Sequence, residues 1–429
     1  MDHGLLPLFV AAAICLAPIT PVRAQGADAA AVRSFTIEEA ERLSLNNSAG
    51  LLSSEQDITI AQQRVQEAMF LFLPEVGLQA SATRYDARYP FALPPELRSI
   101  LLFPSQHDQI YSGRGYLLQT IYSGGRVLNL LHLAQTALKQ AQSQYEAVKM
   151  DTSLGVRRVF YQLLLAQDSY EAATERLKAA QAFLPHGSSA GWERMEAEAL
   201  ISGLRAKQAE LGHEVDLAGL EFRKQLNIEL DTPVRVVGKL ETQQVDVDLN
   251  KAIVWAMELR PELQAETYKA RIDDIGVSLA QSRRNPTVFV ESNYELTGQT
   301  FPIRQNNWEA TVGLRIPFSF DFGAQIRQKR AEKRQGEIKR AETQDQVRLE
   351  VRQAYAHMSF WQNEWPQRER EFVRLRTLTE AAPAGSKSLE PLRAQSALLD
   401  AQERFLTSVK EHLIARARLE RAVGRTLTH

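Results

Sequence analysis

Along most of the chain, apolar side chains recur at alternating spacings of three and four residues, the pattern of amphipathic helices that pack as coiled coils. The longest such run, residues 126–184, contains no proline. A helix of that length would span roughly 90 Å, more than a compact domain needs. The sequence therefore predicts long antiparallel helices that form a rod. Their apolar positions include Ile58, Ala61, Val65, Ala68 and Phe72; Leu131, Ala134, Leu138, Ala141, Tyr145 and Val148; and Val347, Val351, Ala354, Met358, Trp361 and Trp365.

A second pattern, strict alternation of apolar and polar residues, predicts four strands. It is clearest over residues 308–316, 288–296 and 76–83, and weaker over 116–122. Alternation over about ten residues fits a transmembrane strand with one face toward lipid and one toward a lumen. It fits equally well a sheet of a soluble protein with one solvent-exposed face. On the membrane interpretation, the lumen face carries Glu291, Glu295, Glu309 and Arg315.

The number of strands bears on these alternatives. Four strands cannot close a barrel, because about eight are needed merely to surround a side-chain-filled interior. Open sheet edges do not occur in lipid. If these strands lie in a membrane, several chains must contribute to one barrel.

The order of these patterns occurs twice. One short helix is predicted to begin at Thr36 and another at Asp248, each with an acceptor side chain at the N-cap. The helical run that follows ends at Pro74 in the first half and at Pro286 in the second. An ordered series of matches at a slowly changing offset indicates an internal duplication. Other matched segments are Ser123-Gly124-Gly125-Arg126 with Asp321-Phe322-Gly323-Ala324, Val156-Arg157-Arg158 with Val351-Arg352-Gln353, and Met195-Glu196-Ala197 with Leu392-Arg393-Ala394.

The N-terminal residues have the pattern of an export signal. Residues 5–17 are almost wholly apolar, two prolines follow, and Val22-Arg23-Ala24 has the residue spacing of a signal-peptidase site. We therefore predict a signal peptide over residues 1–24, a first repeat over 25–228, a linker over 229–247 and a second repeat over 248–429. The only cysteine, Cys15, lies in the predicted signal, so disulfides and cysteine-rich metal sites are excluded. No later apolar run is long enough for a transmembrane helix.

Composition and charge narrow the function classes. Lys and Arg number 51 against 52 Asp and Glu, so there is no basic excess of the kind that nucleic-acid binding requires. The eight histidines show no metal-ligand spacing, and no cofactor motif appears. Residues 187–191 match the G-x-S-x-G motif by letter, but a helix precedes them where a hydrolase needs a strand, so a helix-hairpin turn is predicted and an enzyme is not.

A basic stretch follows the fourth predicted strand. Acidic residues interrupt it, and no aromatic residues are interleaved. The pattern predicts a solvated helix face near anionic headgroups, with a ring of charge in a lumen as the alternative. Its cations are Arg327, Lys329, Arg330, Lys333, Arg334, Lys339 and Arg340.

Several segments together resemble the TolC family of outer-membrane efflux proteins, over residues 35–427. The resemblance rests on the order in which these segments occur and on their counterparts in the second half, since no single motif is decisive. The segments are Thr36-Ile37-Glu38-Glu39-Ala40 with Leu43 and Asn46-Asn47, then Leu73-Pro74, Tyr122-Ser123-Gly124-Gly125-Arg126, and Phe160-Tyr161-Gln162-Leu163-Leu164-Leu165-Ala166.

The resemblance implies an α+β membrane protein with an internal two-fold repeat. Each protomer of a homotrimer would contribute four transmembrane β-strands to a 12-stranded barrel in the bacterial outer membrane. Long antiparallel coiled-coil helices would form a periplasmic tunnel. The implied function is a passive exit duct, driven by an inner-membrane transporter through a periplasmic adaptor protein. The alternative is a soluble periplasmic coiled-coil adaptor or scaffold.

Two functional regions follow from this resemblance. The hairpin tips would contact the adaptor, although the first tip lacks the Arg and Asp that the family usually carries there. The periplasmic end would be gated by the second-half hairpin, where a proline inside the helix predicts a kink over residues 362–366. Charged residues beyond it would pair with neighbouring hairpins, or would form an ordinary charged surface. The tip residues are Gly187, Ser188, Ser189, Gly191, Gly385, Ser386 and Leu389, and the gate residues are Pro366, Arg374 and Arg376.

Overall fold

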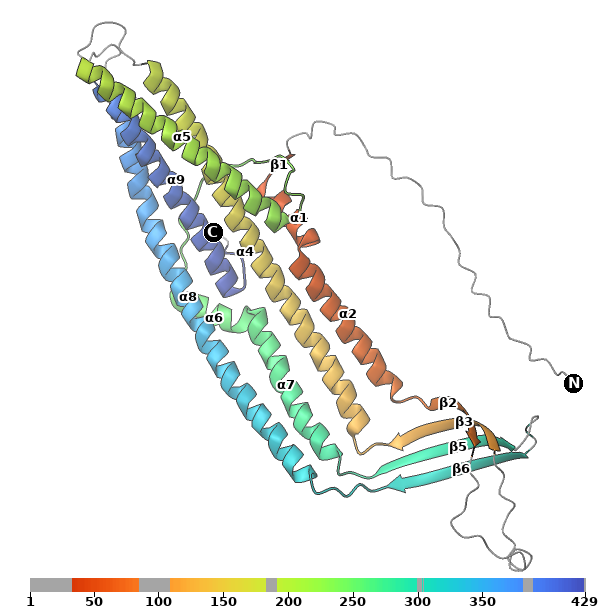
Figure 1. Ribbon diagram of the computed structural model, residues 1–429. Coiled ribbons are helices and arrows are strands. Elements are labelled where there is room, and N and C mark those ends of the chain that lie inside the picture. The colour runs from red at the N-terminus through yellow and green to blue at the C-terminus, as the bar shows by residue number, and fades with distance from the viewer. Residues whose placement is uncertain are drawn as a thin grey trace, which may run out of the picture.

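The computed structural model describes residues 33–84, 109–182, 191–298, 303, 305–380 and 389–427. Figure 1 shows an elongated molecule whose helices run along its length, with a β-sheet at one end and the free ends of the long helices at the other. The rod predicted from helical spacing is therefore confirmed.

The elements fall into two series with the same order. The first contains β1 (Arg33–Phe35), α1 (Ile37–Asn47), α2 (Ala49–Phe70), β2 (Glu75–Arg84), β3 (Gln109–Tyr122), α4 (Arg126–Ala182) and α5 (Gly191–Leu226). The second contains β4 (Val234–Val236), α6 (Leu249–Leu259), α7 (Pro261–Ser282), β5 (Thr287–Gly298), β6 (Gln305–Arg315), α8 (Phe322–Glu380) and α9 (Glu390–Val423). Corresponding helices match in length: α1 and α6 have 11 residues each, α2 and α7 have 22, and α4 and α8 have 57 and 59.

The four-stranded sheet has the order β2-β3-β5-β6, and each neighbouring pair is antiparallel. Each of these strands connects to one helix of a layer in which α2 packs on α4, α4 on α7 and α7 on α8. The helices therefore follow the lateral order of the strands. The sheet and the helical layer form one continuous wall, with β2 and α2 at one edge and β6 and α8 at the other (Figure 1).

Local sequence fixes the ends of the short helices. Thr36 caps α1 as predicted: its hydroxyl accepts from the Glu39 backbone N–H, and the Glu39 carboxylate accepts from the Thr36 N–H. Asp248 caps α6 by accepting from the Lys251 N–H at 2.9 Å. The two predicted helix starts are thus confirmed.

A glycine pair makes the turn from β3 into α4. Gly124 and Gly125 have φ values of 63° and 85°, which side chains with a Cβ rarely adopt. The Asn285 side-chain amide donates to the Gly124 carbonyl at 2.8 Å, and a Cβ on Gly124 would clash with Asn285. This contact ties the β3–α4 joint to the α7–β5 joint.

The apolar core is divided along the rod. One cluster surrounds Phe160 of α4 and Phe222 of α5, whose ring centroids lie 6.3 Å apart. Phe35 of β1 meets Phe222 edge-on at 5.9 Å. A second cluster joins α6, α8 and α9, and a third fills the tip half between α4, α5 and α9.

The segment between the two series is attached to the helices rather than free. Within the predicted linker, residues 229–247, β4 pairs in parallel with β1. Leu240 and Val245 are buried, and the Val245 N–H donates to the Gln362 side chain at 3.1 Å. The segment is therefore attached to α8 close to Pro366.

Candidate channel wall and hairpin ends

One face of the sheet is apolar across all four strands. Because cross-strand partners share a face, the register places the alternating apolar residues of each strand in one continuous surface. Leu78, Trp308 and Val312 on this face are exposed by 92%, 75% and 76%. An apolar surface of this extent needs a covering partner. Its members are Val76, Leu78, Ala80 and Ala82 of β2, Tyr111 and Leu117 of β3, Val288, Val290, Tyr294 and Leu296 of β5, and Trp308, Ala310, Val312 and Leu314 of β6.

The opposite face is polar, and all four residues expected in a lumen lie on it. Glu291 pairs with Thr311, Glu295 with Asn307, Glu309 with Asn293 and Arg315 with Thr287. The register thus places these four residues on the face opposite Val312 and Leu314. Their place in a lumen stays a prediction.

Sequence analysis missed an arginine at the centre of the polar face. The Arg114 side chain on β3 donates to Glu291 Oε1 at 2.9 Å and to Asn293 Oδ1 at 2.7 Å, both on β5. Alternation on β3 is weak because glycines occupy two of its apolar-face positions, Gly113 and Gly115. Because few apolar residues define the apolar face of β3, the alternation pattern does not reveal which of its residues lie on the polar face.

Aromatic rings cover two glycines on the polar face. Tyr116 of β3 lies over Gly77 of β2, and Phe289 of β5 lies over Gly313 of β6, so that a Cβ at either glycine would overlap the ring. Arg315 lies over the Phe289 ring with its guanidinium carbon 5.3 Å from the centroid. Each ring packs flat across its neighbouring strand, which fixes the register of β2 on β3 and of β5 on β6.

Most of the predicted hairpin-tip residues lie outside the described residues: Gly187, Ser188, Ser189, Gly385 and Ser386. Gly191 is the first residue of α5 and is exposed, and Leu389 precedes α9. Figure 1 shows the N-terminal ends of α5 and α9 at the end of the molecule remote from the sheet. Their role in adaptor contact stays a prediction.

The predicted gate residues lie on the tip half of α8. The helix continues through Pro366, which lies inside its bounds. Arg376 Nε donates to Glu380 Oε1 of the same helix at 2.8 Å, while exposed Arg374 makes no side-chain hydrogen bond or ion pair within the described chain. Glu371 pairs with Arg404 of α9 at 3.7 Å, inside the same hairpin. Pairing between hairpins of different protomers and a kink at Pro366 both stay predictions.

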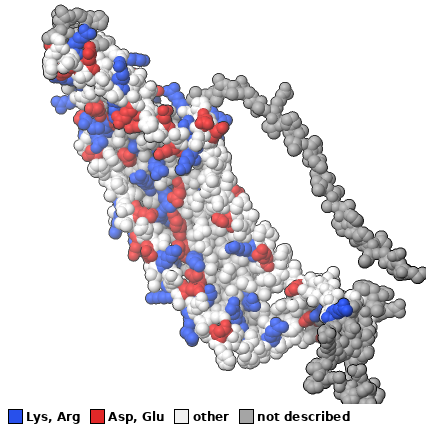
Figure 2. Space-filling model, in the orientation of Figure 1, with Lys and Arg blue, Asp and Glu red and all other residues white. Residues whose placement is uncertain are grey.

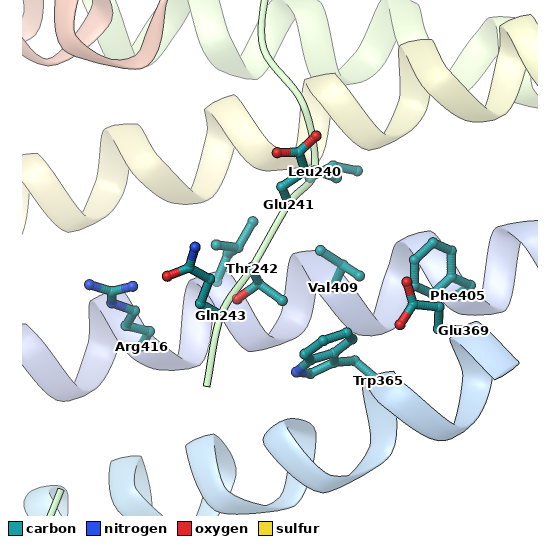
Figure 3. Close-up of a pocket in the computed structure, with 10 residues that line it drawn as sticks. Leu240, Glu241, Thr242, Gln243, Trp365, Glu369, Phe405, Val409 and Arg416 are labelled. Carbon is teal, nitrogen blue, oxygen red and sulfur yellow. The ribbon is translucent and has the colours of Figure 1, made fainter. Parts of the chain in front are cut away.

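A groove of about 580 Å³ adjoins the proline (Figure 3). The inter-repeat segment forms one wall through Leu240, Thr242 and Gln243, and Trp365 of α8 and Phe405 of α9 form the others. The buried Trp365 Nε1 has no hydrogen-bond partner among the described residues. The groove therefore lies between the inter-repeat segment and the turn of α8 that contains Trp365.

A buried histidine lies between the inter-repeat segment and α9. His412 is fully buried, and its Nδ1 shares a 2.6 Å hydrogen bond with the Thr242 hydroxyl. Burial, and to a smaller extent the positive charge of Arg416, lower the pKa of His412 to about 4. The imidazole is therefore neutral at pH 7.

Ion pairs between residues far apart in sequence lie at mid-rod, and the pair of Arg157 with Glu420 joins the two halves. Arg157 of α4 contacts Glu41 of α1 at 2.5 Å and Glu420 of α9 at 2.8 Å. Arg260, only 3% exposed, contacts Glu350 of α8 at 2.7 Å. These partners are far apart in sequence, so no local spacing signals them.

The described part of the chain offers no sign of other chemistry. On the face that Figure 2 shows, Lys, Arg, Asp and Glu are interspersed over the helices without a field of one sign. The described residues contain no group of three or more His, Cys, Asp or Glu side chains that could hold a metal ion. None of the described helices is both long enough and apolar enough to cross a membrane.

Comparisons with known proteins agree with this architecture. Residues 42–189 match the family model "Outer membrane efflux protein". No curated protein sequence matches the chain.

Solved structures match over most of the chain. CusC, whose crystal structures describe folding and transmembrane channel formation, has 16% identity, a TM-score of 0.74 and coverage of 91% of this chain and 92% of its own. The Campylobacter jejuni CmeC outer membrane channel has 13% identity, a TM-score of 0.74 and coverage of 90% and 85%. The Neisseria gonorrhoeae MtrE outer membrane channel, in an open state, has 14% identity, a TM-score of 0.73 and coverage of 91% and 89%. The resemblance to the outer-membrane efflux family is thus confirmed, by sequence over residues 42–189 and by fold over most of the chain.

Proposed function

We propose that this protein is the outer-membrane channel subunit of an export system, a passive duct for substrates that an inner-membrane transporter drives through a periplasmic adaptor. One observation carries the proposal: a sheet with one apolar and one polar face continues, strand by strand, into a layer of long helices. A wall of this kind suits a pore that crosses lipid and extends as a tunnel into the periplasm. A soluble adaptor would have no use for the exposed apolar face of the sheet.

Closure of the wall requires more copies of the chain. Within the described residues, β2 and β6 each have one unpaired edge. An open edge is not stable in lipid, and four strands are too few for a closed barrel. A trimer that joins β6 of one copy to β2 of the next supplies 12 strands, and the family likeness supports this number.

In such a trimer, the polar face would line the pore. Glu291, Glu295, Glu309, Arg114 and Arg315 would then contact water and cargo. Arg114 neutralises part of the acidic charge by its contact with Glu291. The matched helix lengths support the proposed duplication, with repeats over residues 25–228 and 248–429 after a signal peptide over 1–24.

The periplasmic end would carry the adaptor contacts and the gate. In this proposal the hairpin tips that contact the adaptor comprise Gly187, Ser188, Ser189, Gly191, Gly385, Ser386 and Leu389. Pro366 removes the hydrogen bond to the Gln362 carbonyl and would let the tip half of α8 bend. In this proposal Arg374 and Arg376 pair with acidic residues of neighbouring hairpins in the closed state.

Charge on the lipid face tests the assembly. We expect Val312→Arg and Leu314→Arg each to cost about 2–4 kcal/mol at mid-membrane and to abolish heat-modifiable trimers in outer-membrane extracts. Glu309→Arg, on the opposite face of the same strand, is the matched control and should leave trimers intact. Equal tolerance of all three substitutions would contradict a membrane role for this sheet.

Conductance tests the gate separately. Arg374→Glu and Arg376→Glu should raise single-channel conductance in planar bilayers, because each puts like charges together in the closed ring. Pro366→Ala should lower the frequency of opening, because it restores the helix hydrogen bond. Wild-type conductance and gating in all three variants would place the gate elsewhere while leaving the duct itself in place.

A further inference from the structure

A second groove, of about 380 Å³, lies close to the sheet end of the helical layer, between α4, α7 and α8. Its floor is apolar and includes Leu133, Leu279 and Ala280, and its rim carries the cations Arg283 and Lys329. The groove is therefore amphipathic, with positive charge on its polar side. It is separate from the predicted tips and gate, which lie at the other end of the rod.

The positive charge at this rim is incompletely neutralised. Arg283 Nη1 donates to the neutral Gln325 side chain at 2.6 Å, and the nearby carboxylate, Asp321, contacts Gln325 rather than Arg283 itself. Lys329 pairs with Glu332 at 2.7 Å. Segments 283–284 and 321–332 together contain five Lys or Arg and two Asp or Glu. Three of these cations, Arg284, Arg327 and Arg330, are exposed and make no side-chain hydrogen bond or ion pair within the described chain.

The floor of the groove has room for an apolar chain. A Cβ built on Gly276, a residue of the groove lining, would meet no atom within 4 Å. Nearby, the joint from β6 to α8 exposes Phe318 by 92% and leaves Phe320 fully exposed. Exposed aromatic rings followed by cations are typical of a segment at the boundary between lipid and water.

We propose that this groove binds an anionic phospholipid of the membrane leaflet that faces the periplasm. Arg283 and Lys329 would contact the phosphate, and the floor formed by Leu133, Leu279 and Ala280 would hold part of an acyl chain. The proposal rests on the proposed function, since insertion of the sheet into a membrane brings the groove to headgroup level. Two features favour a lipid over a small inorganic anion: the apolar floor, and the continuation of exposed apolar residues toward the sheet.

Native mass spectrometry of the purified mature protein in an uncharged detergent tests this site. We expect dioleoyl phosphatidylglycerol to bind at least tenfold more tightly than dioleoyl phosphatidylcholine, which has the same chains but no net charge. The double variant Arg283→Gln/Lys329→Gln should weaken phosphatidylglycerol binding by about 30-fold, since each cation near an anionic lipid contributes roughly a fivefold change in affinity. Arg352→Gln, an exposed and unpaired arginine farther along α8, is the matched control and should bind as wild type.

A second variant distinguishes lipid binding in the groove from lipid binding to the charged surface alone. Gly276→Phe fills the floor and keeps every charge, so it should also lose phosphatidylglycerol binding. Equal binding of the two lipids by the wild type, or wild-type binding of phosphatidylglycerol by the filled and the charge-neutralised variants, would overturn the proposal. Each variant is also tested for conductance. A wild type that trimerises and conducts but binds the two lipids equally counts against the lipid site alone, whereas a wild type that neither trimerises nor conducts counts against the proposed function.

Discussion

The two longest helices differ sharply in how their tip halves are packed. α4 and α8 are nearly equal in length, and both are buried near the middle, at Leu163 and at the matched Met358. Beyond that level α4 remains buried to Ala180, because it packs against both α5 and α9. α8 has no buried residue after Met358. Packing density governs local opening, so the tip half of α8 should be the more mobile one, which suits a gate.

Matched positions show the same contrast in charge. Arg157 of α4 bonds two carboxylates from other helices, whereas its counterpart Arg352 of α8 is exposed and makes no such contact within the described chain. One copy of the repeat therefore uses this position to join the halves of the molecule. In the other copy, the arginine at this position makes no such contact within the described chain.

The largest expected difference concerns the tip halves themselves. Leu177→Ala should lower the free energy of unfolding by about 2–4 kcal/mol, since it leaves a cavity between α4, α5 and α9. Phe372→Ala, at the matched position of α8, removes a partly buried ring stacked on Phe405 and should cost less, about 1–2 kcal/mol. Thermal unfolding measures both. An equal loss in the two variants would contradict the contrast in packing.

The ion-pair contrast predicts the next effect. Arg157→Ala should cost about 2–4 kcal/mol, because Glu41 and Glu420 would be left partly buried without a partner. Arg352→Ala is the matched control and should leave the unfolding transition unchanged. If the two variants have the same free energy of unfolding, the ion pairs of Arg157 do not stabilise the protein.

The attachment of the inter-repeat segment to α9 should depend on pH. The folded-state pKa of His412 is about 4 and its ordinary value is 6.5, so between these values the unfolded chain binds more protons. Stability therefore falls as pH falls through this window, by about 2 kcal/mol at pH 5 relative to pH 8. His412→Gln should remove this part of the acid sensitivity.

Comparison of wild type with the His412→Gln variant isolates the contribution of His412 to the pH dependence of stability. Burial raises the pKa of Asp168 to about 6, so that carboxyl titrates in the same range with the opposite sign. Both chains carry Asp168, and its effect cancels in the difference. Identical pH profiles for wild type and His412→Gln would show that His412 does not titrate as expected.

The smallest effect concerns the two helix starts. Thr36→Ala and Asp248→Ala should each cost about 1 kcal/mol, since each removes an N-cap acceptor. Thr36→Ala should cost slightly more, because the reciprocal bond from Glu39 is weakened with it. The difference between the thermal unfolding temperatures of the two variants measures this effect.

Local patterns were sufficient for the elements and for the two faces of the sheet. Alternation placed Glu309 and Val312 on opposite faces, and side-chain acceptors at Thr36 and Asp248 marked helix starts. These features depend on residues close in sequence, where period and capping rules apply.

Features made by distant residues could not be predicted in this way. The partners of Arg157 lie 116 and 263 residues away, and no spacing rule connects them. The pairing of β4 with β1 turned a predicted linker into part of the fold. Glycines on β3 concealed the face on which Arg114 lies. In each case tertiary packing decides the role of the residue.

Single-channel recording from the purified mature protein in a planar bilayer shows whether the protein forms a duct. We expect discrete openings of a water-filled pore in wild type and in Glu309→Arg, and none in Val312→Arg. A wild-type protein that stays in aqueous extracts without detergent and gives no openings at any voltage would contradict an outer-membrane duct.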